Sequence, residues 1–199
     1  MIVVRTRKRR VDRRTVIEVY AKYDCPKKNH PIPDFATWNW SQPDAIDREM
    51  KCVGLKTGIP AGYVLWDEVE VTIADLRECA VDVNIFPGQP RRLGLVGAAE
   101  LFRWTQSCEN AWYKDIARGQ ILEPNTPMLL RPAVSDESPA SWYIEDGSGR
   151  AVAFVANQHL FAAALTVTIG YLGRTPDPHS SIMRERFREL LPSKSSRVE

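Results

Sequence analysis

The segment of this chain whose residues could do chemistry most directly is Asp146-Gly147-Ser148-Gly149-Arg150. Gly147 and Gly149 lack a Cβ atom, so the backbone can bend sharply and approach a ligand closely. The apolar, alanine-rich residues that follow predict a helix, whose N-terminal amides and positive dipole end favour an anion. Arg150 in its first turn can add a forked contact to a phosphate. The pattern indicates a phosphate-binding turn.

Two acidic residues beside this turn could take part in hydrolysis. Asp146 can orient a divalent cation or a water molecule, whereas Glu145, its neighbour in an extended strand, points to the opposite face. We therefore expect Arg150 and Asp146 to be catalytic, with Asp146 binding the metal and Glu145 as a further candidate or a solvated charge. The alternative for the whole turn is structural: Asp146 caps the helix and Arg150 is solvated.

The turn needs a strand before it and a helix after it, and the sequence predicts both. Trp142–Glu145 is typical of a strand, and residues 150–164 are typical of a helix. The same patterns predict further strands at 81–85, 126–134 and 166–172, and helices at 96–106 and 108–118. Together they predict a small mixed sheet flanked by helices, of the α+β or α/β class.

The sequence on either side of this domain is different in character. Before it we predict a strand at 15–22, a proline-rich loop at 25–43, a helix at 43–53, turns at 54–62 and a strand at 63–73; after it, an amphipathic helix at 180–191. Trp38 and Trp40 lie in the loop and could stack on unpaired bases, anchor a partner or pack internally. We expect three regions: residues 1–62 as an arm and extension packing on the core, 63–175 as the domain, and 176–199 as a helix and tail.

Charge is distributed unevenly along the chain. Residues 1–28 contain ten Lys and Arg side chains and three acidic ones, whereas the rest contains seventeen and twenty-two. A basic arm on a mildly acidic body suits a polyanion, and a solvated tail is the alternative. The candidate DNA-binding residues are Arg7, Lys8, Arg9, Arg10, Arg13 and Arg14.

Cysteine spacing and hydropathy narrow the class of protein. The four cysteines are scattered without a C-x-x-C pair, which predicts reduced thiols in a cytoplasmic protein rather than a zinc site. No apolar run reaches the roughly 18 residues of a membrane-spanning helix, so we expect no integral membrane segment.

Three motifs, in this order along the chain, resemble those of the ParB/sulfiredoxin superfamily. Asn84–Arg91 resembles its N-x-x-Q-P-R segment, and Pro127–Pro132 is similar to its P-I-x-V-R-P strand. Gly147–Ala153 fits its G-x-x-R-x-x-A pattern. The resemblance covers about residues 82–172, and the order of the motifs is more specific than any one of them.

The resemblance implies a site and its cofactors. The nucleotide-phosphate-binding residues would be Gly147, Ser148, Gly149, Arg150, Arg131 and Arg91. The cofactors would be ATP and a divalent cation, most simply Mg²⁺. Ser148 and Gly149 stand where sulfiredoxins have a catalytic cysteine and a histidine, so thiol repair is not expected. The short stretch after Leu172 argues against the further regions of partition-type ParB proteins.

The nuclease and nucleotide-hydrolase branch of the superfamily remains, and it includes a plasmid-encoded fertility-inhibition factor. This resemblance implies a DNase and ATPase that blocks DNA transfer through a type IV secretion system. Its partners would be DNA, ATP and the secretion coupling protein or a relaxase–DNA complex, at the inner face of the inner membrane. The alternatives are a non-catalytic adaptor that binds nucleotide or DNA and blocks the coupling protein, and a plain nucleic-acid-binding module that uses the arm.

Overall fold

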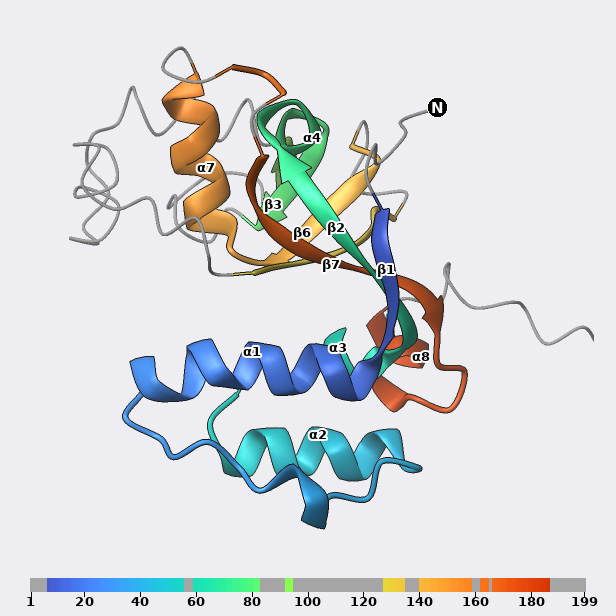
Figure 1. Ribbon diagram of the computed structural model, residues 1–199. Coiled ribbons are helices and arrows are strands. Elements are labelled where there is room, and N and C mark those ends of the chain that lie inside the picture. Colours follow the sequence, from blue (N-terminus) through green and yellow to red (C-terminus); the bar gives the residue numbers. More distant parts are fainter. Residues whose placement is uncertain are drawn as a thin grey trace, which may run out of the picture. The chain divides into compact units, whose positions relative to one another are not determined.

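The computed structural model describes residues 7–55, 59–82, 92–94, 127–134, 140–158, 162–164 and 166–186, which form two compact units (Figure 1). Unit one comprises the described parts of 1–10 and 67–172, and unit two those of 11–66 and 173–199. We expected three regions divided after residues 62 and 175. The structure instead divides the chain after residues 10, 66 and 172, and 11–66 and 173–199 belong to one unit. The described arm residues 7–10 fall with the central domain.

Strands in the described residues form one seven-stranded sheet, in the order β1-β2-β7-β5-β6-β3-β4. Their bounds are β1 Arg7–Asp12, β2 Tyr63–Thr72, β3 Cys79–Asp82, β4 Arg92–Gly94, β5 Met128–Pro132, β6 Trp142–Asp146 and β7 Thr166–Pro176. The sheet is mixed, because β3–β6 and β5–β7 are parallel whereas β3–β4 and β5–β6 are antiparallel. The predicted class of mixed sheet and helices is confirmed.

The core of unit one lies between this sheet and two helices, α4 (Ile73–Arg77) and α7 (Ser148–Ala156). From α7 the buried side chains include Val152, Phe154 and Val155, and they pack with sheet residues such as Leu130 and Ile144. Every residue of α7 from Gly149 to Ala156 is buried. Apart from Ser148 and Arg150 the helix has no polar side chain, as is typical of a core element, so the turn that begins α7 is held by the core of unit one.

Unit two is mainly helical. Its elements are α1 (Arg13–Lys27), the 3₁₀ turn η1 (Phe35–Thr37), α2 (Pro43–Cys52), α3 (Ile59–Gly62) and α8 (Ser181–Arg186). The short helix α3 contacts α1, α2 and α8. Gly62 at its end approaches α8 so closely that an added Cβ would lie 2.8 Å from the sulfur of Met183. Packing around α3 therefore joins the helices of this unit.

The strand predicted at residues 15–22 is wrong, because this segment lies inside helix α1. Its β-branched residues favour a strand locally, but Val16, Ile17, Tyr20 and Ala21 recur at helical spacing and are all buried. Asp12 caps the helix by accepting the Thr15 amide at 2.8 Å. Burial of a continuous helical face outweighs the local preference for a strand.

Other predicted elements hold with changes in length. The helix expected at 150–164 runs only over Ser148–Ala156, and the Asn157 side chain bonds back to Ala153 O at 2.9 Å. The strand predicted at 63–73 ends one residue earlier, because Thr72 and Asp75 form a capping box that starts α4. The helices expected at 96–106 and 108–118 lie outside the described residues, as do most of the 81–85 strand and the end of the 180–191 helix.

Candidate functional site

The β6–α7 turn adopts the backbone that its glycines predict. Gly147, the N-cap of α7, has φ +94° and ψ 11°, in the left-handed region that favours glycine. An added Cβ there would lie 2.8 Å from Met128 Cγ and 3.0 Å from Arg150 Nη2. Both the dihedral angle and the space make a larger residue strained at this position.

This turn presents the N-terminus of α7 with no capping side chain at Gly147 itself. The first helical hydrogen bond runs from Ala151 N to Gly147 O, at 2.9 Å. The amides of Ser148, Gly149 and Arg150 therefore have no acceptor within the helix. Since Gly147 is the N-cap, Asp146 lies one residue too early for that position, which counts against the cap expected from the structural alternative.

Arg150 is buried rather than solvated. The residue is only 5% exposed, and its Nη2 donates a hydrogen bond to Pro127 O at 3.0 Å. The guanidinium also lies against Gly147, as the short distance to a Cβ there indicates. Arg150 thus links the residue before β5 to the turn. Arg150 therefore holds the turn in place. Its guanidinium could contact a phosphate only if it became accessible to solvent.

Arg131 and Glu145 form an ion pair that the sequence patterns did not predict. Arg131 Nε lies 2.6 Å from Glu145 Oε1, with side chains 1% and 13% exposed. The Arg131 guanidinium lies 4.1 Å from the centre of the Tyr143 ring, and Nη1 donates to Pro132 O at 2.9 Å. Two residues proposed for the site therefore interact with each other across β5 and β6. The solvated charge considered for Glu145 is wrong.

Asp146 ends β6 half-buried, opposite Leu129, where the β5–β6 register shifts. Within the part of the chain that the structure describes, no three His, Cys, Asp or Glu side chains gather to form a metal site. Arg91, the remaining proposed phosphate ligand, lies outside the described residues. The described part of the proposed site thus consists of the turn backbone, Ser148, Asp146 and the buried Arg150.

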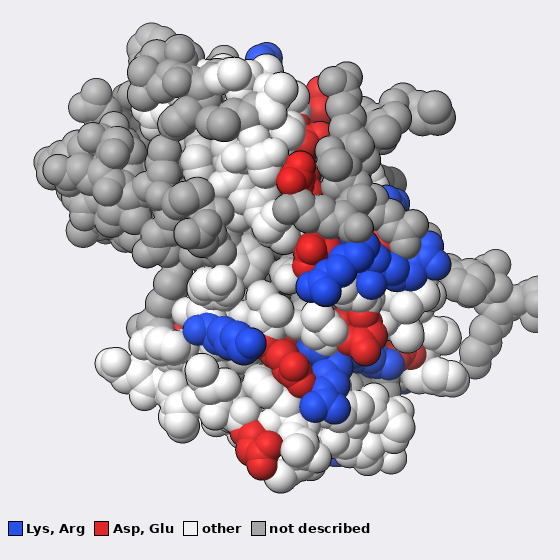
Figure 2. Space-filling model, in the orientation of Figure 1, with Lys and Arg blue, Asp and Glu red and all other residues white. Residues whose placement is uncertain are grey.

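The basic residues proposed to bind DNA are mostly paired with acids where their side chains are described. On β1, Arg9 donates twice to Glu68 Oε2, at 3.2 and 3.0 Å, and Arg10 lies 3.9 Å from Asp67. Figure 2 shows blue and red surfaces adjoining on this face of the molecule. Arg7 and Lys8 also belong to β1. The described arm is therefore an ordered strand whose positive charge is partly balanced.

Arg13 and Arg14 belong to unit two, on the first turn of α1. Arg13 Nη2 lies 2.8 Å from Asp177 Oδ2. Arg14 pairs with Glu18 at 2.6 Å and lies 5.4 Å from the centre of the Trp40 ring. The six basic residues are thus divided between two units and two kinds of element.

The Trp38–Trp40 loop is packed within unit two. Trp38 is 7% exposed, and its ring stacks on Trp40 at 5.5 Å between centroids. Trp40 Nε1 donates to Phe35 O at 3.0 Å, and Arg14 lies over its ring. These contacts favour the internal-packing alternative over base stacking by the two indoles.

Comparison of the chain with protein-family models, curated proteins and solved structures gives no match. None of the helices in the described residues is long and apolar enough to cross a membrane.

Proposed function

We propose that the protein binds a nucleotide phosphate at the β6–α7 turn and belongs functionally with the ParB-like nucleases. The observation that carries the proposal is the left-handed Gly147 at the start of a buried helix, φ +94°. A glycine adopts this left-handed backbone without strain, and the turn leads directly into a helix N-terminus, whose amides favour an anion. No other turn in the described residues combines such a glycine with the start of a helix of this length.

The full activity we propose is hydrolysis of ATP and DNA that blocks DNA transfer through a type IV secretion system. The turn motif and the resemblance to the plasmid fertility-inhibition protein Osa support it. In this proposal the turn amides bind phosphate and Asp146 orients Mg²⁺ or the attacking water. Arg150 holds the turn against Pro127, which suits a preorganised phosphate site. DNA and the coupling protein or relaxase–DNA complex would be the partners.

A non-catalytic adaptor is the second candidate function. It is favoured by the hydrogen bonds that the charged residues already make within the protein. Arg150 is bonded to a main-chain oxygen, and Arg131 and Glu145 are bonded to each other. Charges engaged in this way are less available for transition-state stabilisation. In this case nucleotide would bind at the turn without turnover, while other surfaces bind the secretion partner.

The test uses Gly147→Ala with Gly54→Ala as its matched control. Both glycines have positive φ, +94° and +72°, so each alanine introduces comparable backbone strain, but Gly54 lies in unit two. Arg150→Ala is less suitable, because it leaves a buried acceptor without its donor. The parent and both variants are incubated with plasmid DNA, Mg²⁺ and ATP, and nucleotide binding, phosphate release and DNA integrity are followed together.

Loss of nucleotide binding and of both hydrolytic activities in Gly147→Ala alone would support the enzyme. Nucleotide binding by the parent without turnover, again lost only in Gly147→Ala, would support the adaptor. Equal nucleotide binding by all three proteins would contradict a phosphate site at this turn.

A further inference from the structure

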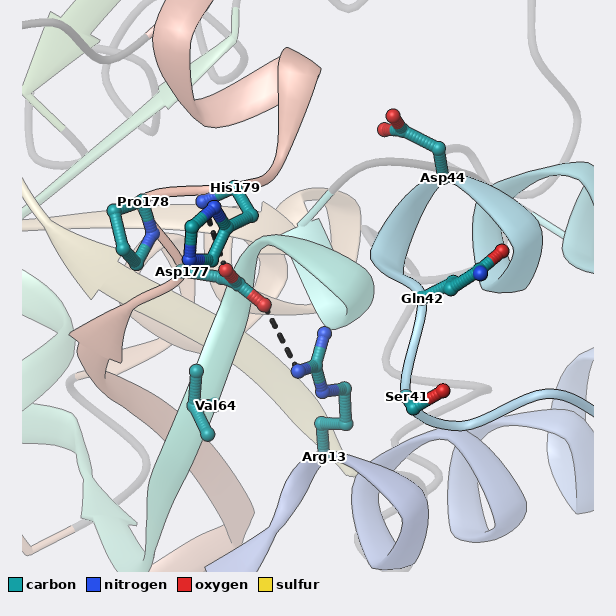
Figure 3. Close-up of a pocket in the computed structure, with 8 residues that line it drawn as sticks. All are labelled: Arg13, Ser41, Gln42, Asp44, Val64, Asp177, Pro178 and His179. Atoms are coloured by element: carbon teal, nitrogen blue, oxygen red, sulfur yellow. Dashed lines mark hydrogen bonds and ion pairs between the residues drawn. The ribbon is translucent and has the colours of Figure 1, made fainter.

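Unit two contains a cavity of about 540 Å³ that is lined by both polar and apolar groups (Figure 3). Its lining comes from the start of α1, the loop before α2, the first turn of α2, β2 and the segment after β7, and comprises Arg13, Ser41, Gln42, Asp44, Val64, Asp177, Pro178 and His179. This volume is within the range typical of small-molecule sites.

An ion pair forms the centre of this cavity. Arg13 Nη2 lies 2.8 Å from Asp177 Oδ2, with side chains 14% and 6% exposed. The other oxygen of Asp177 accepts the His179 amide at 2.9 Å. Figure 3 shows Val64, Pro178 and His179 on one side of this pair and Ser41, Gln42 and Asp44 on the other. Arg13 is therefore already balanced by a carboxylate.

The remaining charge in the lining does not favour an anionic ligand. Asp44 Oδ1 accepts the Ser181 hydroxyl at 2.8 Å, and this hydrogen bond lowers the pKa of the Asp44 carboxyl. Asp44 is consequently ionised at neutral pH. Two carboxylates against one guanidinium give no net positive charge in the lining, so a phosphate gains little there.

The other lining groups suit a neutral ring with polar edges. The Gln42 amide offers a donor and an acceptor, the His179 ring nitrogens can form hydrogen bonds, and the Ser41 oxygen can accept while its hydrogen is donated to Asn39. Gln42 is the N-cap of α2 but makes no side-chain cap bond, so its amide can turn toward a ligand. Val64 and Pro178 supply apolar surface for the ring face.

We propose that this cavity binds a nucleobase, either as a free nucleoside or as an unpaired base of a strand. The base lies across the Arg13–Asp177 pair, so that Gln42 and His179 contact opposite polar edges of it. Pro178 and Val64, on the His179 side, cover part of one face. This site uses no residue of the β6–α7 turn and does not depend on phosphate binding there.

Isothermal titration of the full chain with each common nucleoside, with short single-stranded trinucleotides and with inorganic phosphate tests the proposal. At least one nucleoside should saturate the protein, and Gln42→Ala and His179→Ala should each weaken its binding about tenfold, as expected for one lost hydrogen bond. Gln158→Ala, a glutamine substitution in unit one, is the matched control and should bind like the parent. Thermal melts verify that all three variants are folded. Tighter binding of trinucleotides identifies a strand as the source of the base, and binding of nucleosides alone identifies the free compound.

Four results would overturn the proposal. The first is that no nucleoside saturates the protein, and the second is that inorganic phosphate displaces the bound nucleoside. The third is that Gln42→Ala and His179→Ala both bind like the parent, which would place the nucleoside elsewhere. The fourth is loss of nucleoside binding in Gly147→Ala alone, which would assign it to the turn, so this site and the phosphate turn can fail independently.

Discussion

The β6–α7 turn of unit one and the cavity of unit two are built in opposite ways. At the turn, a left-handed glycine begins the helix, and the nearby arginine is buried against Pro127 O. In the cavity, side chains from five separate stretches supply the polar groups around a paired arginine. In both places a buried or partly buried arginine is paired within the protein, and the groups proposed to bind a ligand are other ones. An arginine near a candidate site is thus not in itself a ligand for an anion.

The largest expected effect comes from the two ion pairs that support these regions. Glu145→Ala leaves Arg131, 1% exposed, without its carboxylate, and Asp177→Ala does the same to Arg13, 14% exposed. We expect Glu145→Ala to lower the free energy of unfolding by about 3–5 kcal/mol and Asp177→Ala by less, because Arg13 is better hydrated. Denaturant titration measures both values.

Replacement of the whole pair by Arg131→Met with Glu145→Leu is the control for this comparison. It should recover most of the lost stability, because no uncompensated charge then remains buried. A smaller loss in Glu145→Ala than in Asp177→Ala would contradict the ranking by exposure.

A smaller difference is expected between two glycines of β7, one in each unit. An added Cβ at Gly170 would lie 2.6 Å from Val71 Cγ2 and 2.7 Å from Leu130 Cδ1, whereas at Gly173 it would lie 2.7 Å from the Tyr63 ring. Methyl groups of aliphatic side chains can shift, but the ring of Tyr63 is 1% exposed and confined. We expect Gly173→Ala to lower the free energy of unfolding by about 2–3 kcal/mol and Gly170→Ala by about 1 kcal/mol. Equal losses in denaturant titration would indicate that both sites relax alike.

The cap of α1 predicts a pH dependence specific to unit two. The hydrogen bond from the Thr15 amide lowers the pKa of Asp12, so ionised Asp12 stabilises the folded state. This contribution is complete above the pKa of the unfolded chain, about 4, and is lost as pH falls through the lower folded value. Asp12→Ala should cost about 1 kcal/mol at pH 7 and much less at pH 2. Asp12→Asn, which keeps an acceptor, should match the parent at pH 7, and a pH-independent cost of Asp12→Ala would contradict this origin.

The smallest expected effect on stability is that of Arg9→Ala in unit one. Arg9 is exposed and its pair with Glu68 is screened by solvent, so the melting temperature should change little. If the arm nevertheless binds DNA, the same variant should weaken binding and reduce its salt dependence. If Arg9→Ala and the parent bind DNA equally at every salt concentration, the main role of Arg9 is its pairing with Glu68.

Features that depend on residues close together in the chain could be predicted from the sequence. The strand β6, the turn at Gly147 and the helix after it follow from alternation, glycine and apolar periodicity. Strand β5 and helix α2 were predicted in the same way and are confirmed. The exception is α1, where β-branched residues obscured a helical spacing that is visible once the burial of Ile17 and Ala21 is known. The capping box at Thr72 was a local signal for α4 that the strand prediction overlooked.

Features that depend on tertiary pairing could not be predicted. Whether Arg131 meets Glu145 is set by the β5–β6 register, which shifts between Leu129 and Leu130. The direction of Arg150 depends in the same way on where Pro127 lies. The cavity brings Arg13 to Asp177, residues far apart in the chain, and no spacing rule connects them. The backbone of the turn was therefore predictable, whereas the partners of its charged side chains were not.

The stacked pair of indoles in unit two gives the molecule an optical property of its own. The ring centroids of Trp38 and Trp40 lie 5.5 Å apart, and the two ring planes are inclined by 26°. Transitions of two chromophores so close mix and give circular dichroism bands of opposite sign that vanish when the rings separate. Because both rings belong to unit two, this signal reports the folding of that unit alone. Comparison with the total helical signal then distinguishes separate melting of the two units from a single cooperative transition.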